Sequence, residues 1–235
     1  MGFIGSFNRN YLRMKNTIIT ILFSLIAFVA LSQTQTTEKS EKQREQFEKF
    51  KNELQIFLNE PVVNFSLKDT FENIVQLKEF KDKILILDFW FTSCAPCIMD
   101  FPYLKKLQTH YKDSSNIIFI SICIDNDERK QVWKGLIHKH ELGGIQVFIP
   151  KNRQNSEENQ YYIDNIKTFP TCLLVSKSGK ILGDLPNIDS FVAAYAIEHG
   201  FQEKSTAQSV EEAFNKSESF NKWVIKNQNY VMGYF

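Results

Sequence analysis

The chain has 235 residues, enough for one domain with extensions at its ends. Its formal net charge is +1, so the composition gives no electrostatic reason to expect a nucleic-acid partner. The 21 phenylalanines can supply a sizeable core, and the presence of only 9 glycines and 6 prolines argues against a low-complexity chain.

The N-terminal segment has the pattern of an export signal. Three basic residues, Arg9, Arg13 and Lys15, precede an uncharged run from residue 17 to residue 31, and no acidic residue occurs before position 38. Small residues at positions 30 and 32 fit a cleavage site before Gln33. We therefore expect residues 1–32 to be a signal peptide or an uncleaved membrane anchor, with Met14 as an alternative start.

Residues 33–60 connect this segment to the rest of the chain. The stretch from 33 to 40 is polar and is interpreted as a linker. Residues 41–58 are heavily charged, with apolar side chains at helical spacing (Phe47, Phe50, Leu54, Phe57 and Leu58), which predicts an amphipathic helix. We expect this helix to lie on the following domain or to space it from a membrane.

Residues 61–200 alternate between strand and helix patterns. Apolar or alternating runs predict strands at 62–67, 74–77, 84–90, 117–124, 146–149, 173–176 and 180–183. Helical patterns cover 97–111, where Pro102 should cause a kink, 128–140, 160–166 and 188–199. This order implies an α/β sheet with helices on both faces.

Residues 201–235 are more polar and are interpreted as a C-terminal helical appendage. Ser209 and Glu212 have the spacing of a capping box at the start of a helix. Phe220, Trp223 and Val224 suggest a further amphipathic helix.

The motif Cys94-Ala95-Pro96-Cys97 points to redox chemistry. It follows the apolar run at 84–91 and opens the predicted helix, so its thiols lie where a buried strand leads into a helix. Unpaired N–H groups and partial positive charge at a helix N-terminus favour a thiolate and lower the pKa of the first thiol from about 8.5. We expect Cys94 to be the attacking thiolate and the more exposed of the pair, and Cys97 to resolve the mixed disulfide.

Two alternatives for this motif are half of a structural zinc site and a static disulfide. Structural zinc needs four ligands, but Cys123 and Cys172 each stand alone in apolar runs. His138 and His140 do not have the spacing of two ligands on one helix face. We therefore expect neither a metal nor a cofactor, and we interpret Cys123 and Cys172 as small buried hydrophobes.

The residues around the motif resemble a thioredoxin-fold protein. Residues 88–97, Asp-Phe-Trp-Phe-Thr-Ser-Cys-Ala-Pro-Cys, match the thioredoxin active-site stretch in register, except that Ser93 replaces a tryptophan. Residues 167–171, Lys-Thr-Phe-Pro-Thr, resemble the loop that carries the cis-proline of that fold. Residues 61–200 are similar to extracytoplasmic thiol:disulfide oxidoreductases of the TlpA/ResA type, in which an acid, an aromatic residue and a proline follow the motif, as at 100–102 here.

The resemblance implies a thioredoxin-like α/β domain with a central mixed sheet, flanked by the N-terminal signal or anchor and by helical extensions. It also implies that Asp100 is the acid that tunes the thiols, with a solvated surface carboxylate as the alternative. Asp88 interrupts an apolar strand, so burial should raise its pKa and suit it to take the proton of Cys97. The alternative for Asp88 is a structural buried acid.

The resemblance further implies that Pro170 is cis and that the backbone beside it docks a substrate chain in strand-like fashion. Phe169 should then touch substrates, and Trp90, which we place with Phe169 and Pro170 at the substrate-binding site, should pack under the motif in a supporting role. An ordinary trans proline is the alternative for Pro170.

The function that these residues indicate is an enzyme, a thiol:disulfide oxidoreductase that reduces protein disulfides outside the cytoplasm. It would be periplasmic, secreted or anchored to the outer face of the inner membrane, and a membrane electron donor would have to re-reduce it. The family resemblance makes apocytochrome c a candidate substrate. Alternatives are a disulfide-introducing oxidase or isomerase, a thiol peroxidase of the peroxiredoxin type, and a non-catalytic binding module.

Overall fold

The computed structural model describes residues 41–42, 44–45, 47–49, 51–52, 54–55, 57–185 and 191–216, and the chain divides into two units, Met1–Lys49 and Phe50–Phe235. The described part of the first unit is helical, and Arg44 and Glu48 form an ion pair one turn apart, at 4.0 Å. The predicted signal or anchor at 1–32 and the linker at 33–40 lie outside the described residues. Among the residues that are described, no helix combines the length and apolar character needed to cross a membrane.

The predicted helix at 41–58 is shorter than expected. Residues 51–52 are helical, but 54–55 and 57–59 form turns. Phe57 and Asn59 adopt left-handed backbone angles, with φ of 54° and 67°, which an α-helix cannot contain. The chain therefore leaves the helix before the sheet begins.

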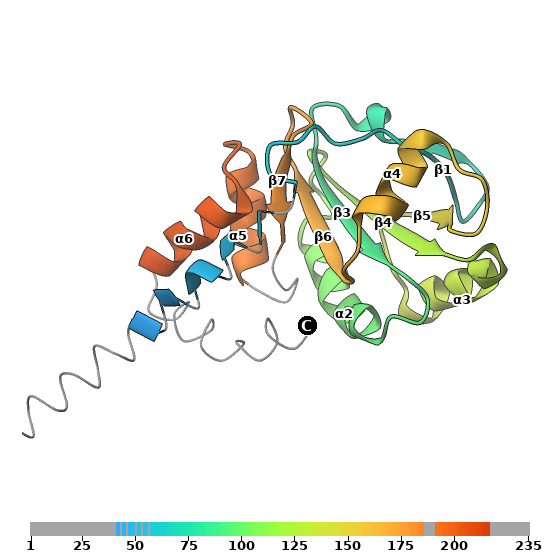
Figure 1. Ribbon diagram of the computed structural model, residues 1–235, viewed down its shortest axis with the longest axis horizontal. Coiled ribbons are helices and arrows are strands. Elements are labelled where there is room, and N and C mark those ends of the chain that lie inside the picture. The colour runs from blue at the N-terminus through green and yellow to red at the C-terminus, as the bar shows by residue number, and fades with distance from the viewer. Residues whose placement is uncertain are drawn as a thin grey trace, which may run out of the picture. The chain divides into compact units, whose positions relative to one another are not determined.

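A seven-stranded mixed sheet forms the centre of the second unit, in the order β2-β1-β5-β4-β3-β6-β7 (Figure 1). In the middle of the sheet, β4 pairs in parallel with β5 on one side and with β3 on the other. All other strand pairs are antiparallel. The strands are β1 (Ser66–Asp69), β2 (Ile74–Gln76), β3 (Ile84–Trp90), β4 (Ile117–Asp125), β5 (Ile145–Pro150), β6 (Thr171–Val175) and β7 (Ile181–Asp184). The expected central mixed sheet is confirmed.

Strand β3 has the bounds that its apolar run predicts, and all seven of its residues are buried. It pairs with β4 on one side and with β6 on the other. Its side chains alternate between two hydrophobic clusters, so Leu85, Leu87 and Phe89 face one side of the sheet while Ile84 and Ile86 face the other. A strand covered on both faces needs this continuous apolar sequence.

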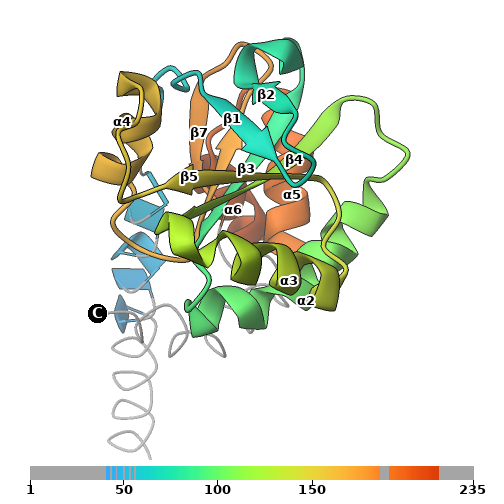
Figure 2. The ribbon, with the colours of Figure 1, turned by 90° about the vertical axis from the view of Figure 1, so that its right-hand side faces the viewer.

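Helices cover both faces of the sheet (Figures 1 and 2). Helices α2 (Ala95–His110) and α5 (Phe191–Gly200) contribute to the cluster with Ile84 and Ile86, and α3 (Lys130–His140) lies beside α2. Helix α4 (Glu157–Asn165) packs on the opposite face. Short 3-10 helices, η1 (Leu77–Phe80) and η2 (Asp127–Arg129), follow β2 and β4. Helix α2 continues through Pro102 to its end.

Several boundaries differ from the sequence prediction because of individual hydrogen bonds. Residues 62–65 are not in a strand: the Val62 N–H bonds to Gly179 O at 2.8 Å, so this stretch follows the turn between β6 and β7 instead of extending β1. Helix α4 begins at Glu157, earlier than predicted, because Ser156 Oγ accepts the Asn159 N–H at 3.3 Å and caps the helix.

The predicted capping box of Ser209 and Glu212 is wrong. Helix α6 runs from Thr206 to Lys216, so Ser209 lies inside it. The cap is formed by Ser205 and Gln208, each of which bonds the backbone N–H of the other, at 3.1 and 2.9 Å. Helix α6 packs against α5 and β7 and buries Val210. The predicted helix around 220–224 lies outside the described residues.

Candidate active site

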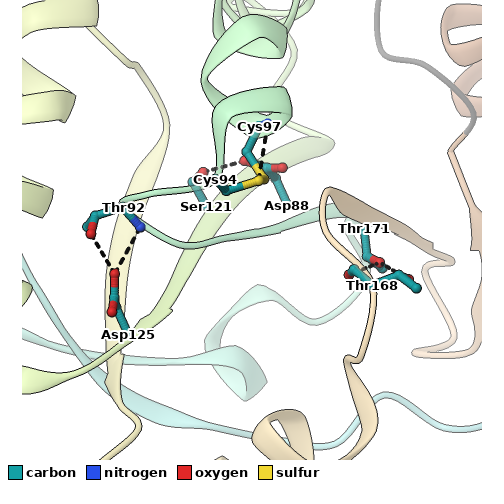
Figure 3. The surroundings of a disulfide bond; sticks show 8 residues. All are labelled: Asp88, Thr92, Cys94, Cys97, Ser121, Asp125, Thr168 and Thr171. Carbon is teal, nitrogen blue, oxygen red and sulfur yellow. Dashed lines mark hydrogen bonds between the residues drawn. A yellow bond between two sulfur atoms is a disulfide. The ribbon is translucent and has the colours of Figure 1, made fainter. Parts of the chain in front are cut away.

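Cys94 and Cys97 form a disulfide where β3 leads into α2 (Figure 3). Cys94 is the N-cap residue of α2, and its Sγ accepts a hydrogen bond from the Cys97 N–H at 3.2 Å. Pro96 lies in the first turn, where its missing N–H leaves no intrahelical bond unmade. The predicted placement of the motif at a helix N-terminus is confirmed.

Both cysteines are buried in this disulfide form. Cys94 is 3% exposed and Cys97 is 2% exposed, so Cys94 is the more exposed of the pair only by a margin too small to distinguish the two sulfurs in the disulfide form. The reason is packing, because both belong to a hydrophobic cluster with Trp90 and Phe101. Met99, the second residue after the motif, is the exposed apolar side chain next to it, at 63%.

Asp88 is buried in β3, and Ser121 Oγ on the neighbouring strand β4 donates to its Oδ2 at 2.6 Å (Figure 3). Burial disfavours the charged carboxylate and raises the pKa of Asp88 to about 6. The hydrogen bond from Ser121 opposes this rise, and the negative charge of Asp100 adds to it. Asp88 can therefore hold a proton near neutral pH.

Asp100 lies on α2, one turn after Cys97, and is buried, so the alternative of a solvated surface carboxylate is wrong. Its charge raises the pKa of Asp88, which places the two carboxyl groups within electrostatic reach of each other. The role of Asp100 in tuning the thiols stays a prediction.

The Phe169–Pro170 peptide bond is cis, as the resemblance implied. Both residues are half-buried, and the Phe169 ring packs edge-on against Phe91, with centroids 5.2 Å apart. Thr171 Oγ1 donates to Thr168 O at 2.8 Å across the proline (Figure 3). Phe91 follows β3 directly, so this contact joins the cis-proline loop to the segment that leads into the motif.

Trp90 packs under the motif, as expected. It is completely buried, shares a cluster with both cysteines and makes a T-shaped contact with Phe101, with centroids 5.0 Å apart. The Trp90 side chain supplies a large apolar surface that shields the two cysteine sulfurs from water on the side that faces the core.

Cys123 and Cys172 are buried free thiols, and burial raises the pKa of both well above its usual range. Cys172 lies directly opposite Asp88 in the β3–β6 ladder. Its N–H bonds to Asp184 Oδ1 at 2.7 Å, and burial raises the pKa of Asp184 to about 7. Within the described part of the chain, no group of three or more His, Cys, Asp or Glu side chains is arranged to hold a metal ion.

Sequence reasoning missed the polar residues that support the motif. Ser121 is the partner of Asp88, and Asp125 and Arg129 are hydrogen-bond partners of Thr92. Asp184 was also missed. Ser121 and Asp125 could have been suspected, because they are polar residues in or at the end of an apolar strand that pairs with the strand preceding the motif.

Comparisons with known proteins agree with this geometry. Residues 58–182, just over half of the chain, match the Redoxin family. The thiol-disulfide oxidoreductase ResA of Bacillus thuringiensis subsp. konkukian is 29% identical over 138 residues, which cover 57% of this chain and 72% of that protein. The thioredoxin-like protein YneN of Bacillus subtilis is 27% identical over 131 residues, covering 56% and 72%.

The fold also matches solved structures. The C-terminal domain of a candidate thiol-disulfide oxidoreductase from Bacteroides thetaiotaomicron superposes with a TM-score of 0.52 at 26% identity, covering 63% of this chain and 99% of that domain. These comparisons confirm the expected thioredoxin-like fold, the resemblance to TlpA/ResA-type proteins and the expected enzyme class, a thiol:disulfide oxidoreductase. With a redox-active cysteine pair at the start of α2 and a family match over residues 58–182, the chain belongs to the Redoxin family.

Proposed function

We propose that this protein is an exported oxidoreductase that reduces disulfides in other proteins. The observation that carries the proposal is the Cys94–Cys97 disulfide at the N-terminus of α2, together with the buried Asp88, whose pKa is raised to about 6. A thiol pair at this position can exchange with disulfides, and an acid that titrates near neutral pH can move a proton for it.

The reaction begins with the reduced pair. The Cys94 thiolate attacks a substrate disulfide, so that a mixed disulfide forms and one substrate sulfur leaves as a thiolate. The Cys97 thiol then gives its proton to the Asp88 carboxylate, and its sulfur attacks the Cys94 sulfur. The second substrate sulfur leaves, the Cys94–Cys97 disulfide forms, and two electrons have passed to the substrate. In this scheme, Asp100 adjusts the proton affinity of Asp88 through its charge.

The substrate chain docks beside the cis-proline loop. An extended chain can bond to the backbone next to Pro170 and place its disulfide near the motif. Phe169 is half-buried against Phe91, so part of its ring remains available to substrate. Trp90 lies wholly within the core and supports the motif from below instead of touching substrate.

Three further parts of the proposal concern the surroundings of the enzyme. The basic and apolar pattern of residues 1–32 supports a location outside the cytoplasm, either released or anchored to the outer face of the inner membrane. Outside the cytoplasm a thiol pair becomes oxidised, so a membrane dithiol donor must return two electrons after each turnover. We propose apocytochrome c, whose haem site contains two cysteines, as a substrate.

The reduction potential of the purified protein tests the direction of electron flow. The protein is equilibrated in dithiothreitol or glutathione buffers, and the state of Cys94 and Cys97 is determined by alkylation and mass spectrometry. A potential near or below about −270 mV supports a reductant, whereas a value near about −120 mV would make the protein an oxidant that introduces disulfides.

Trapping tests the assigned thiol roles. Cys97→Ser should accumulate a mixed disulfide with substrate protein through Cys94, because nothing resolves it. Cys94→Ser should form none. Trapping by Cys94→Ser alone would reverse the assignment, and equal trapping by both variants would contradict it.

A further inference from the structure

Thr92 lies two residues before Cys94 in the short loop between β3 and α2, and it is buried. Its Oγ1 donates to Asp125 Oδ2 at 2.5 Å, and its backbone N–H donates to the same oxygen at 3.0 Å (Figure 3). A buried hydroxyl costs free energy unless it is hydrogen-bonded, so this double contact ties the loop to the end of β4.

Arg129 completes the arrangement from a third segment. It is the last residue of η2, and its Nε–H donates to Thr92 Oγ1 at 2.9 Å. Since the hydroxyl oxygen accepts from Arg129, the hydroxyl hydrogen is directed to Asp125. The other carboxylate oxygen, Oδ1, accepts the Asn126 N–H at 2.8 Å, which fixes the orientation of Asp125.

These bonds act on the position of the Cys94 sulfur. Residues 91–93 connect the buried end of β3 to Cys94, whose N–H bonds back to Phe91 O at 3.0 Å. Within residues 91–93, the Thr92 side chain is hydrogen-bonded to other segments of the chain, namely to Asp125 and Arg129. Movement of Thr92 would therefore move the residue that caps α2.

We propose that Thr92, Asp125 and Arg129 form a clamp that holds the Cys94 sulfur at the N-terminus of α2, and that Arg129 is a positioning residue for thiol–disulfide exchange that acts through Thr92. The clamp matters for the reaction because the Cys94 sulfur, held in this position, accepts the Cys97 N–H at 3.2 Å. That N–H and the helix dipole stabilise the thiolate that attacks substrate.

Opening the clamp should change the Cys94 pKa and the reduction potential in defined directions. If the clamp opens, the Cys94 thiolate loses its helix N-terminal contacts, and the pKa of the Cys94 thiol rises. The reduced protein then becomes less stable relative to the disulfide, so the reduction potential becomes more negative. A rise of one pKa unit lowers the thiolate fraction about tenfold below the pKa, and a tenfold change in the exchange equilibrium corresponds to about 30 mV.

The test measures the alkylation rate of Cys94 against pH in the reduced full-length protein, together with the reduction potential. Arg129→Gln removes the guanidinium donor, and Thr92→Val removes the hydroxyl while keeping the shape of the side chain. Both should move the pH profile of Cys94 alkylation up by about one unit, which slows alkylation about tenfold at pH values below the wild-type pKa, and should make the reduction potential up to about 30 mV more negative at pH values above it.

Two controls separate positioning from other effects. Thr92→Ser keeps the hydroxyl and should retain the wild-type pH profile. Arg153→Gln also removes a positive charge, but the Arg153 guanidinium pairs with the Asp127 carboxylate, at 2.5 Å, and not with Thr92. This variant should leave both the pH profile and the potential unchanged.

The proposal is overturned if Arg129→Gln keeps the wild-type pH profile and potential. It is also overturned if Arg153→Gln shifts the profile and the potential as much as Arg129→Gln does, since loss of positive charge alone would then explain the effect. Should Thr92→Val fail to fold, Arg129→Gln decides, because Arg129 is only partly buried. Both readouts use the protein without a substrate or donor, so the result does not depend on the direction of electron flow proposed above.

Discussion

Replacing Asp88 with asparagine should stabilise the protein at neutral and alkaline pH and change its stability little in acid. Burial raises the pKa of Asp88 from 3.8 to about 6. The free energy that the protonated group contributes to folding is present below the unfolded pKa and is lost as the pH rises through about 6. Since one pKa unit corresponds to about 1.4 kcal/mol, the ionised side chain costs about 3 kcal/mol at neutral pH.

Asparagine removes this cost and keeps an oxygen that can accept the Ser121 hydroxyl. Urea unfolding of the oxidised wild-type and Asp88→Asn proteins measures the difference in unfolding free energy. The difference should grow from near zero at about pH 4 to about 3 kcal/mol at about pH 7 and then stay constant. The exposed carboxylate Asp113 provides the matched control, because Asp113→Asn should show no comparable change.

The reasoning would be refuted by a stability difference that does not vary with pH, or by a variant that is less stable than wild type above pH 6. Either result would mean that Asp88 is ionised at little cost in the folded protein. It would then be a structural acid whose proton affinity cannot serve Cys97. The expected stabilisation should accompany slower exchange, by about 100-fold, because the variant cannot take the proton of Cys97.

Three other outcomes are expected. Pro170→Ala should slow the reduction of a protein disulfide by about tenfold or more while a small-molecule disulfide reacts at a similar rate, because only the docked chain uses this loop. Cys123 and Cys172 are buried with raised pKa values, so mass spectrometry should find both unmodified after alkylation of the folded protein and both modified in denaturant. Gly183→Ala should lower the unfolding free energy by about 2 kcal/mol or more, because the φ angle of Gly183 is +123° and the added Cβ would collide with Leu54 O. The control is Gly135→Ala in α3, where a Cβ would enter open space, and this variant should be neutral or stabilising.

Local patterns in the chain predicted the elements that position the motif. The apolar run of β3 and the helix after it depend on residues close together in sequence, so periodicity and composition suffice. The boundaries failed where a side chain or turn acts locally in a way that periodicity does not show. Ser156 starts α4 early, and Ser205 instead of Ser209 caps α6.

The cysteine pair and the acid inside β3 were identifiable from residue type and spacing, whereas the cis-proline loop was identified only through the resemblance to thioredoxin-fold proteins. Tertiary structure alone decided how these parts act on each other. It buries Cys94 as deeply as Cys97 and brings Asp100 out of solvent. It also pairs Asp88 with Ser121, 33 positions away, and Thr92 with Arg129, 37 positions away. Such contacts depend on which strands become neighbours, and no periodicity within one segment encodes that choice.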